Sequence, residues 1–120
     1  MKFYNYLNGI FYALYGLFGT LIPISMAKLM GWTPSLLGLH QIRATSFVMA
    51  ALGIILCLIT SQNRDQKLIT MVLIFVTLSF AAGRCLGLII DGAGPIQTYY
   101  EIGFEIFWST LGALLIYRSK

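Results

Sequence analysis

Residues 68 to 90 read LITMVLIFVTLSFAAGRCLGLII, an apolar run in which Arg84 is the one charged side chain. A helix needs about 20 such residues to cross the ~30 Å hydrocarbon core of a membrane. The run is followed by Asp91-Gly92-Ala93-Gly94-Pro95, a segment rich in turn formers. Residues 68–90 are therefore predicted to form one transmembrane helix.

Three further apolar runs of similar length cover residues 6–24, 34–60 and 99–117. The second opens near Thr33-Pro34, a capping residue followed by a proline in the first turn. All the runs are continuous instead of alternating, which favours helices over strands. The sequence predicts an all-α, up-down-up-down bundle of four transmembrane helices that forms a single domain over residues 1–120.

The overall composition supports a membrane protein. Charged residues make up 10% of the chain, against about 25% in an average soluble domain, and hydrophobic residues make up 58%. The mean hydropathy is +0.82. The net charge of +4 comes from residues scattered near the ends of the apolar runs, without a basic stripe, so nucleic acid is excluded as a partner and the lipid bilayer is expected.

The distribution of lysine and arginine predicts the orientation, because cytoplasmic loops retain these residues. One side of the predicted bundle carries Lys2, Arg64, Lys67, Arg118 and Lys120, and the other carries Lys28 and Arg43. This asymmetry places both termini in the cytoplasm. One alternative remains for residues 6–24, because Ser25-Met26-Ala27 has the small-x-small form of a signal-peptidase site.

Small residues recur at helical spacing in all four runs and predict close helix packing, because membrane helices associate through small side chains. The rows are Gly9, Ala13, Gly16 and Thr20 in the first run, Ser79, Gly83 and Gly87 in the third, and Ala50, Gly53, Gly103 and Gly112 in the second and fourth. Whether these faces meet within one chain or between chains stays open.

Metal and cofactor motifs are absent from the sequence, which has no Cys-x-x-Cys, no histidine pair and no glycine-rich phosphate loop. His40 alone cannot form an ordinary zinc site. Neither a metal nor a cofactor is expected. Cys57 and Cys85 are expected to differ in depth by about 15 Å, whereas bridged Cα atoms lie within about 7 Å. We therefore expect both thiols to be free.

Six polar residues form the candidate site, and all map to the outer half of the predicted bundle. They are His40 and Arg43 in the second run, Arg84 and Asp91 at the third, and Glu101 and Glu105 in the fourth. Antiparallel helices joined near Ala93-Gly94 bring Arg84 opposite Glu105. The sequence predicts contact between these two side chains as a buried salt bridge, which is either structural or part of a ligand site.

The other four members have structural explanations as well. Glu101 follows Thr98 by three residues, the spacing of a capping box. His40 suits the headgroup layer, and Arg43 can extend to the outer surface. Asp91 opposes the dipole of the preceding helix and is expected to seek a cation or a turn amide.

The residues Ala82-Gly83-Arg84, Gly87, Asp91-Gly92 and Pro95, together with Arg43 and Glu105, carry a family resemblance. The chain resembles the small bacterial membrane proteins grouped as domain of unknown function 4345, over nearly its whole length. The resemblance implies a multi-pass protein of the bacterial inner membrane, with Arg43, Arg84, Asp91 and Glu105 at the family's polar positions, and it implies no reaction. A looser likeness to the DoxX type is an analogy of fold only.

Three classes of function fit this sequence, and catalytic residues cannot be assigned. The first is a binding or accessory subunit that docks a larger membrane protein or a second copy of itself. The second is an enzyme or binding protein for a lipophilic molecule, with Arg84 and Arg43 holding its polar head and Glu105 or Asp91 as acid or base. The third is a small proton-coupled transporter that uses Glu105.

Overall fold

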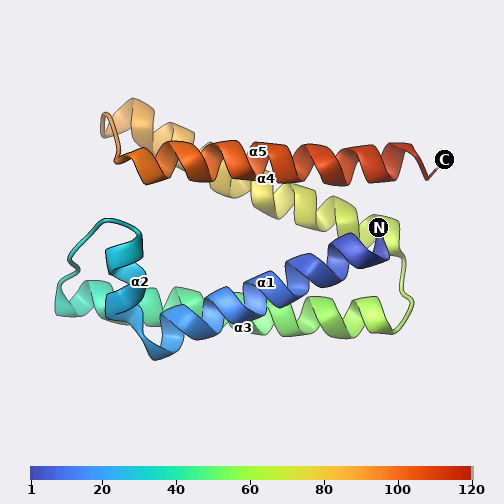
Figure 1. The fold of residues 1–120 in the computed structure, drawn as a ribbon, viewed down its shortest axis with the longest axis horizontal. Coiled ribbons are helices and arrows are strands. Elements are labelled where there is room, and N and C mark those ends of the chain that lie inside the picture. The colour runs from blue at the N-terminus through green and yellow to red at the C-terminus, as the bar shows by residue number, and fades with distance from the viewer. Residues whose placement is uncertain (120) are drawn as a thin grey trace. The chain divides into compact units, whose positions relative to one another are not determined.

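The computed structural model describes residues 1–119, and five α-helices with no strand make up its secondary structure, as the all-α prediction requires. They are α1 (Lys2–Leu21), α2 (Pro23–Leu29), α3 (Leu36–Ser61), α4 (Gln66–Ile90) and α5 (Ile96–Tyr117) (Figure 1). The contacts divide the chain after Arg64 into two compact units. We call α1 to α3 the N-terminal hairpin and α4 with α5 the C-terminal hairpin, and describe each by itself.

Two helices, α3 and α4, are long and apolar enough to cross a membrane, and the number rises to three if α1 and α2 form one bent span. The structure thus supports part of the four-helix prediction. Among the described residues, α5 is long enough to cross a membrane but not apolar enough, because Glu101 and Glu105 lower its hydropathy.

The first apolar run is not one helix, which corrects the prediction for residues 6–24. It breaks after Leu21, and α2 leaves the direction of α1 by 114°. Pro23 opens α2, where its missing amide hydrogen is tolerated but where it cannot continue the hydrogen bonds of α1. In α2 the buried side chains are Pro23, Met26 and Ala27.

The starts of α3 and α4 are set by side-chain caps. Ser35 accepts a hydrogen bond from the Gly38 amide at 3.2 Å, so α3 begins after Ser35 and not at Thr33-Pro34. Asp65 Oδ1 accepts from the amides of Lys67 and Leu68 at 3.0 and 3.1 Å and starts α4 two residues before the predicted position. The predicted end of α4 at Ile90 is confirmed.

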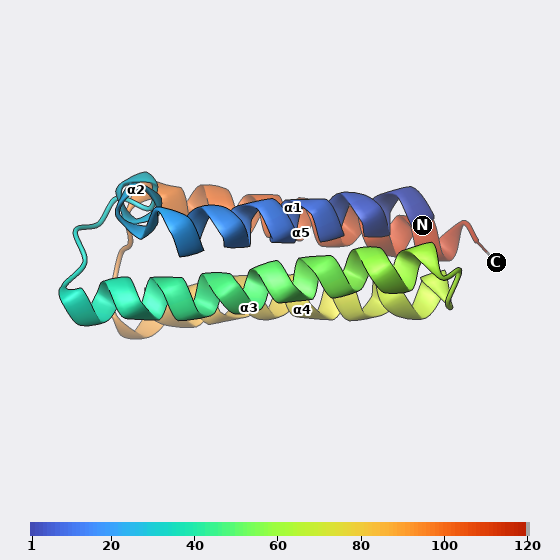
Figure 2. The ribbon, with the colours of Figure 1, turned by 90° about the horizontal axis from the view of Figure 1, so that it is seen from below.

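In the N-terminal hairpin, α1 and α3 run antiparallel with their backbones in contact (Figure 2). A Cβ atom on Gly16 would lie 2.3 Å from the backbone nitrogen of Ala50, and one on Gly53 would lie 2.2 Å from that of Ala13. Real Cβ atoms do not approach backbone so closely, and glycine is therefore required at both positions. The predicted small-residue packing is confirmed here, and it forms within one chain.

In the C-terminal hairpin, α4 and α5 are antiparallel as well, but their small residues are used differently (Figure 1). The buried side of α4 consists of Ile69, Thr70, Leu73, Thr77 and Ala81. The row of Ser79, Gly83 and Gly87 lies on another side of the helix. A Cβ atom on Gly83 would meet no described atom within 4 Å. This row does not form the contact between α4 and α5.

Candidate functional site

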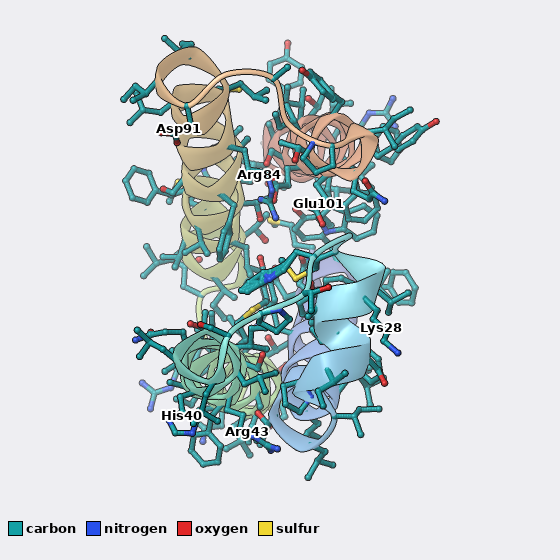
Figure 3. The ribbon with its side chains drawn as sticks, turned by 90° about the vertical axis from the view of Figure 1, so that its left-hand side faces the viewer. Lys28, His40, Arg43, Arg84, Asp91 and Glu101 are labelled. Carbon is teal, nitrogen blue, oxygen red and sulfur yellow. The ribbon has the colours of Figure 1, made fainter. Side chains whose placement is uncertain are left out.

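Arg84 joins α4 to α5 through two carboxylates. Its Nε donates to Glu101 Oε2 at 2.8 Å, and its Nη1 donates to Glu105 Oε1 in a second ion pair. Glu101 and Glu105 lie one helical turn apart and therefore share a face of α5. Figure 3 shows Arg84 and Glu101 pointing toward each other from the two helices. The predicted contact of Arg84 with Glu105 is confirmed.

Glu101 has a different role from the predicted one. The residue that precedes α5 is Pro95, and the amide of Thr98 donates to the carbonyl of Pro95 at 3.0 Å. Thr98 therefore lies inside the first turn and cannot act as a capping residue, so the capping-box prediction is wrong. The four-residue spacing from Glu105 was the sequence signal that placed Glu101 within reach of the same arginine.

The ion pairs are half-buried, which corrects the prediction of a buried salt bridge. The exposed fractions are 26% for the Arg84 side chain, 36% for Glu101 and 13% for Glu105. The Phe80 ring covers part of the guanidinium, with its centroid 5.9 Å from Cζ. Glu105 is the deepest of the three, and its second oxygen, Oε2, is buried without a hydrogen-bond partner in the described part of the chain.

Asp91 ends α4, and its own amide donates to the carbonyl of Gly87 at 2.8 Å. Its carboxylate has neither the cation nor the turn amide that we expected, as far as residues 1–119 show. Beside it lies an open hollow of about 300 Å³. The hollow is lined by Arg84, Gly87, Leu88, Asp91, Gly92, Ala93, Gly94 and Thr98.

His40 and Arg43 lie on α3 and belong to the other hairpin (Figure 3). Arg43 Nη1 donates to the backbone carbonyl of Thr20 at 2.5 Å. Thr20 is in the last turn of α1, where carbonyls lack partners in the helix. The structure thus gives Arg43 a capping role at the break between α1 and α2. His40 is exposed.

The charges around the hollow are mostly negative. Arg84 and Asp91 line the hollow with one charge of each sign. Glu101 and Glu105 do not line it, but they contact Arg84 and bring the formal sum of the four groups to about −2 at neutral pH. Because Arg84 is already shared by two carboxylates, it is poorly suited to hold an anionic ligand. This arrangement favours a cationic guest over an anionic one.

Neither a metal group nor a disulfide is found in the described residues. No cluster of three His, Cys, Asp or Glu side chains lies close enough to hold a metal ion. Cys57 and Cys85 are both free, as expected. Cys57 contributes to the packing of α1 on α3, because its Sγ would lie 2.7 Å from a Cβ atom placed on Gly9.

Fold and site together define a small helical protein with at least two helices able to cross a membrane and a hairpin joined by a shared arginine. The chain belongs to the family described as Domain of unknown function (DUF4345), which matches residues 1–116 and confirms the predicted resemblance. No curated protein and no solved structure matches the chain. The family description assigns no activity.

Proposed function

We propose that the chain is an accessory subunit of the bacterial inner membrane, with four crossing helices and both termini in the cytoplasm. Two length arguments support the crossings of α1 and α5. Their 20 and 22 residues correspond to about 30 and 33 Å, enough to span the hydrocarbon core. In α5 the two glutamates share Arg84, which lowers the cost of placing them near lipid.

The orientation rests on the lysines and arginines of one side, which are Lys2, Arg64, Lys67, Arg118 and Lys120. Alkaline phosphatase, which is active only in the periplasm, should be inactive when fused after Lys120. A fusion after Gly94, in the opposite turn, should be active and serves as the control. An active fusion after Lys120 would contradict the proposed orientation.

The accessory role rests on one observation, the open positions Ser79 and Gly83 in the small-residue row of α4. In the N-terminal hairpin, the space beside glycines at similar spacing is occupied by the backbone of a neighbouring helix. On α4, Ser79 and Gly83 are exposed and Gly83 has open space around it. Small residues let a membrane helix approach closely. We propose that this row binds a transmembrane helix of a larger membrane protein.

The experiment compares Gly83→Leu with Ala82→Leu, which places the same side chain at the neighbouring exposed position, about 100° around the helix. Both tagged proteins should fold and insert like the wild type. A partner recovered with the wild type in fixed stoichiometry should be retained by Ala82→Leu and lost by Gly83→Leu. Equal retention of the partner by both variants would contradict the docking face. Self-association that is lost only in Gly83→Leu would show that the row binds a second copy of the chain and not a larger protein.

A second candidate, binding of a lipophilic small molecule, is favoured by the hollow beside Arg84 and Asp91. The engagement of Arg84 by Glu101 and Glu105 weakens the version of this proposal in which Arg84 holds an anionic group. Proton-coupled transport is supported less, because Glu105 is held by Arg84. Catalytic chemistry has no specific support from this geometry.

A further inference from the structure

The size of the hollow at the turn between α4 and α5 limits what it can bind. Its volume is about 300 Å³. One water molecule takes up about 30 Å³ of liquid, and small-molecule sites begin at about 300 Å³. The hollow is therefore much larger than a single water or bare ion and has room for a small organic group.

The C-terminal end of α4, which borders the hollow, offers several hydrogen-bond acceptors. The last carbonyls of a helix have no partner within it. At this end of α4, the amide of Asp91 bonds to Gly87, and no amide of residues 92–94 donates to a backbone carbonyl of the described chain. The last turn of α4 has no basic residue. The Asp91 carboxylate adds two more acceptor oxygens at the negative end of the helix dipole.

The net negative charge of Arg84, Asp91, Glu101 and Glu105 favours a ligand whose hydrogen-bond donor is a cation. Glu101 and Glu105 neutralise Arg84 and leave an excess of negative charge, so a phosphate or carboxylate alone would be repelled. A primary ammonium brings one positive charge and three N–H donors. It can therefore donate to Asp91 and to carbonyls of the last turn of α4 at the same time.

The length of α4 places this end among lipid headgroups, a step that rests on the proposed crossing of the membrane. Its 25 residues span about 38 Å, more than the ~30 Å of the hydrocarbon core. We infer that the hollow binds the primary ammonium of an aminophospholipid headgroup, such as phosphatidylethanolamine, through Asp91 and the free carbonyls of α4. A free amine from the aqueous phase would satisfy the same chemistry.

Native mass spectrometry of the full chain in detergent, with defined lipids, tests the inference. Phosphatidylethanolamine should bind about tenfold more tightly than phosphatidylcholine with the same acyl chains, because the quaternary ammonium of the latter has no N–H donor. Asp91→Asn should remove this preference. Asp65→Asn is the matched control at the other end of α4 and should retain it, because asparagine also caps helices.

Equal binding of the two lipids by the wild type, or a preference that survives in Asp91→Asn, would overturn the inference. If Asp91→Asn does not fold, the wild-type comparison decides. Displacement of the lipid by millimolar ethanolamine would identify the ammonium alone as the recognised group, and its failure would identify the lipid. Release of the chain from membranes by alkaline carbonate would overturn the crossing of α4 and this site together, whereas retention with equal lipid binding overturns the site alone.

Discussion

The two hairpins of this protein hold their helices together in different ways. In the N-terminal hairpin, Gly16 and Gly53 bring the backbones of α1 and α3 into direct contact. In the C-terminal hairpin, Arg84 bridges α4 to two glutamates of α5, and Gly83 is left open. Both hairpins carry small residues at helical spacing. In the second hairpin Ser109 and Gly112 of α5 are buried, but the Ser79-Gly83-Gly87 row of α4 does not make the contact.

The difference shows what small-residue spacing can and cannot indicate. It indicates that a helix is able to pack closely, whereas the facing helix decides whether it does so. Opposite α1, α3 presents small residues, among them Ser46, Ala50 and Gly53. Opposite Arg84, α5 presents Glu101 and Glu105 instead. The row on α4 does not contact α5, and we propose that it binds a partner.

The largest effect is expected from placing a large side chain in the contact between α1 and α3 of the N-terminal hairpin. Gly16→Leu places a side chain against the backbone of Ala50, which cannot move aside as a flexible side chain could. We expect a loss of about 3 kcal/mol or more in the free energy of unfolding, measured by denaturant titration in mixed micelles. Gly103→Leu is the matched control, because a Cβ atom there meets nothing within 4 Å of described chain. Similar losses of stability in both variants would contradict the claim that Gly16 is closed by backbone and Gly103 is open.

A smaller effect is expected from the arginine of the C-terminal hairpin. Arg84→Ala leaves Glu101 and Glu105 close together without a cation, and we expect a loss of about 2 kcal/mol, below the 3 to 5 kcal/mol of a fully buried pair because these groups are half-exposed. Glu101→Ala should cost less than about 1 kcal/mol.

The double variant of Arg84→Ala with Glu105→Ala should lose less than the two single losses added together. The reversed pair, Arg84→Glu with Glu105→Arg, should recover part of the loss. Strict additivity of Arg84→Ala and Glu105→Ala, measured by the same titration, would contradict their pairing.

The break between α1 and α2 provides a third test. Arg43→Met keeps much of the side-chain length and removes the hydrogen bond to the Thr20 carbonyl. A loss of about 1 kcal/mol is expected. Arg118→Met removes an exposed arginine that directly follows α5 and should leave the free energy of unfolding nearly unchanged. Equal stability of these two variants would show that Arg43 does not cap α1.

Much of the helix assignment was accessible from the sequence, because apolar runs and turn formers act locally. The end of α4 at Ile90 and the pairing of Arg84 with Glu105 followed from the short turn between two antiparallel helices. The hydropathy of the first run does not predict the break at Pro23, because it continues through the proline.

The candidate site was predictable only in part, because its six residues come from separate segments. Arg84, Glu101 and Glu105 meet, and Asp91 lines the same hollow as Arg84. Arg43 instead caps α1, since the free carbonyl of Thr20 arises from the unpredicted break between α1 and α2. The capping-box prediction for Glu101 fails because α5 begins at Ile96, three residues before the predicted start.

The central claim, that Gly53 is closed by backbone in the first hairpin whereas Gly83 is open in the second, is tested most directly by one matched pair of variants. Gly53→Ala and Gly83→Ala add the same methyl group to a helix, and their free energies of unfolding should be measured side by side. We predict a loss of about 2 kcal/mol or more for Gly53→Ala, whose Cβ atom would lie 2.2 Å from the Ala13 nitrogen. Gly83→Ala should be unchanged or more stable by up to about 1 kcal/mol, because alanine favours helix over glycine. Equal losses, or a larger loss for Gly83→Ala, would contradict the account.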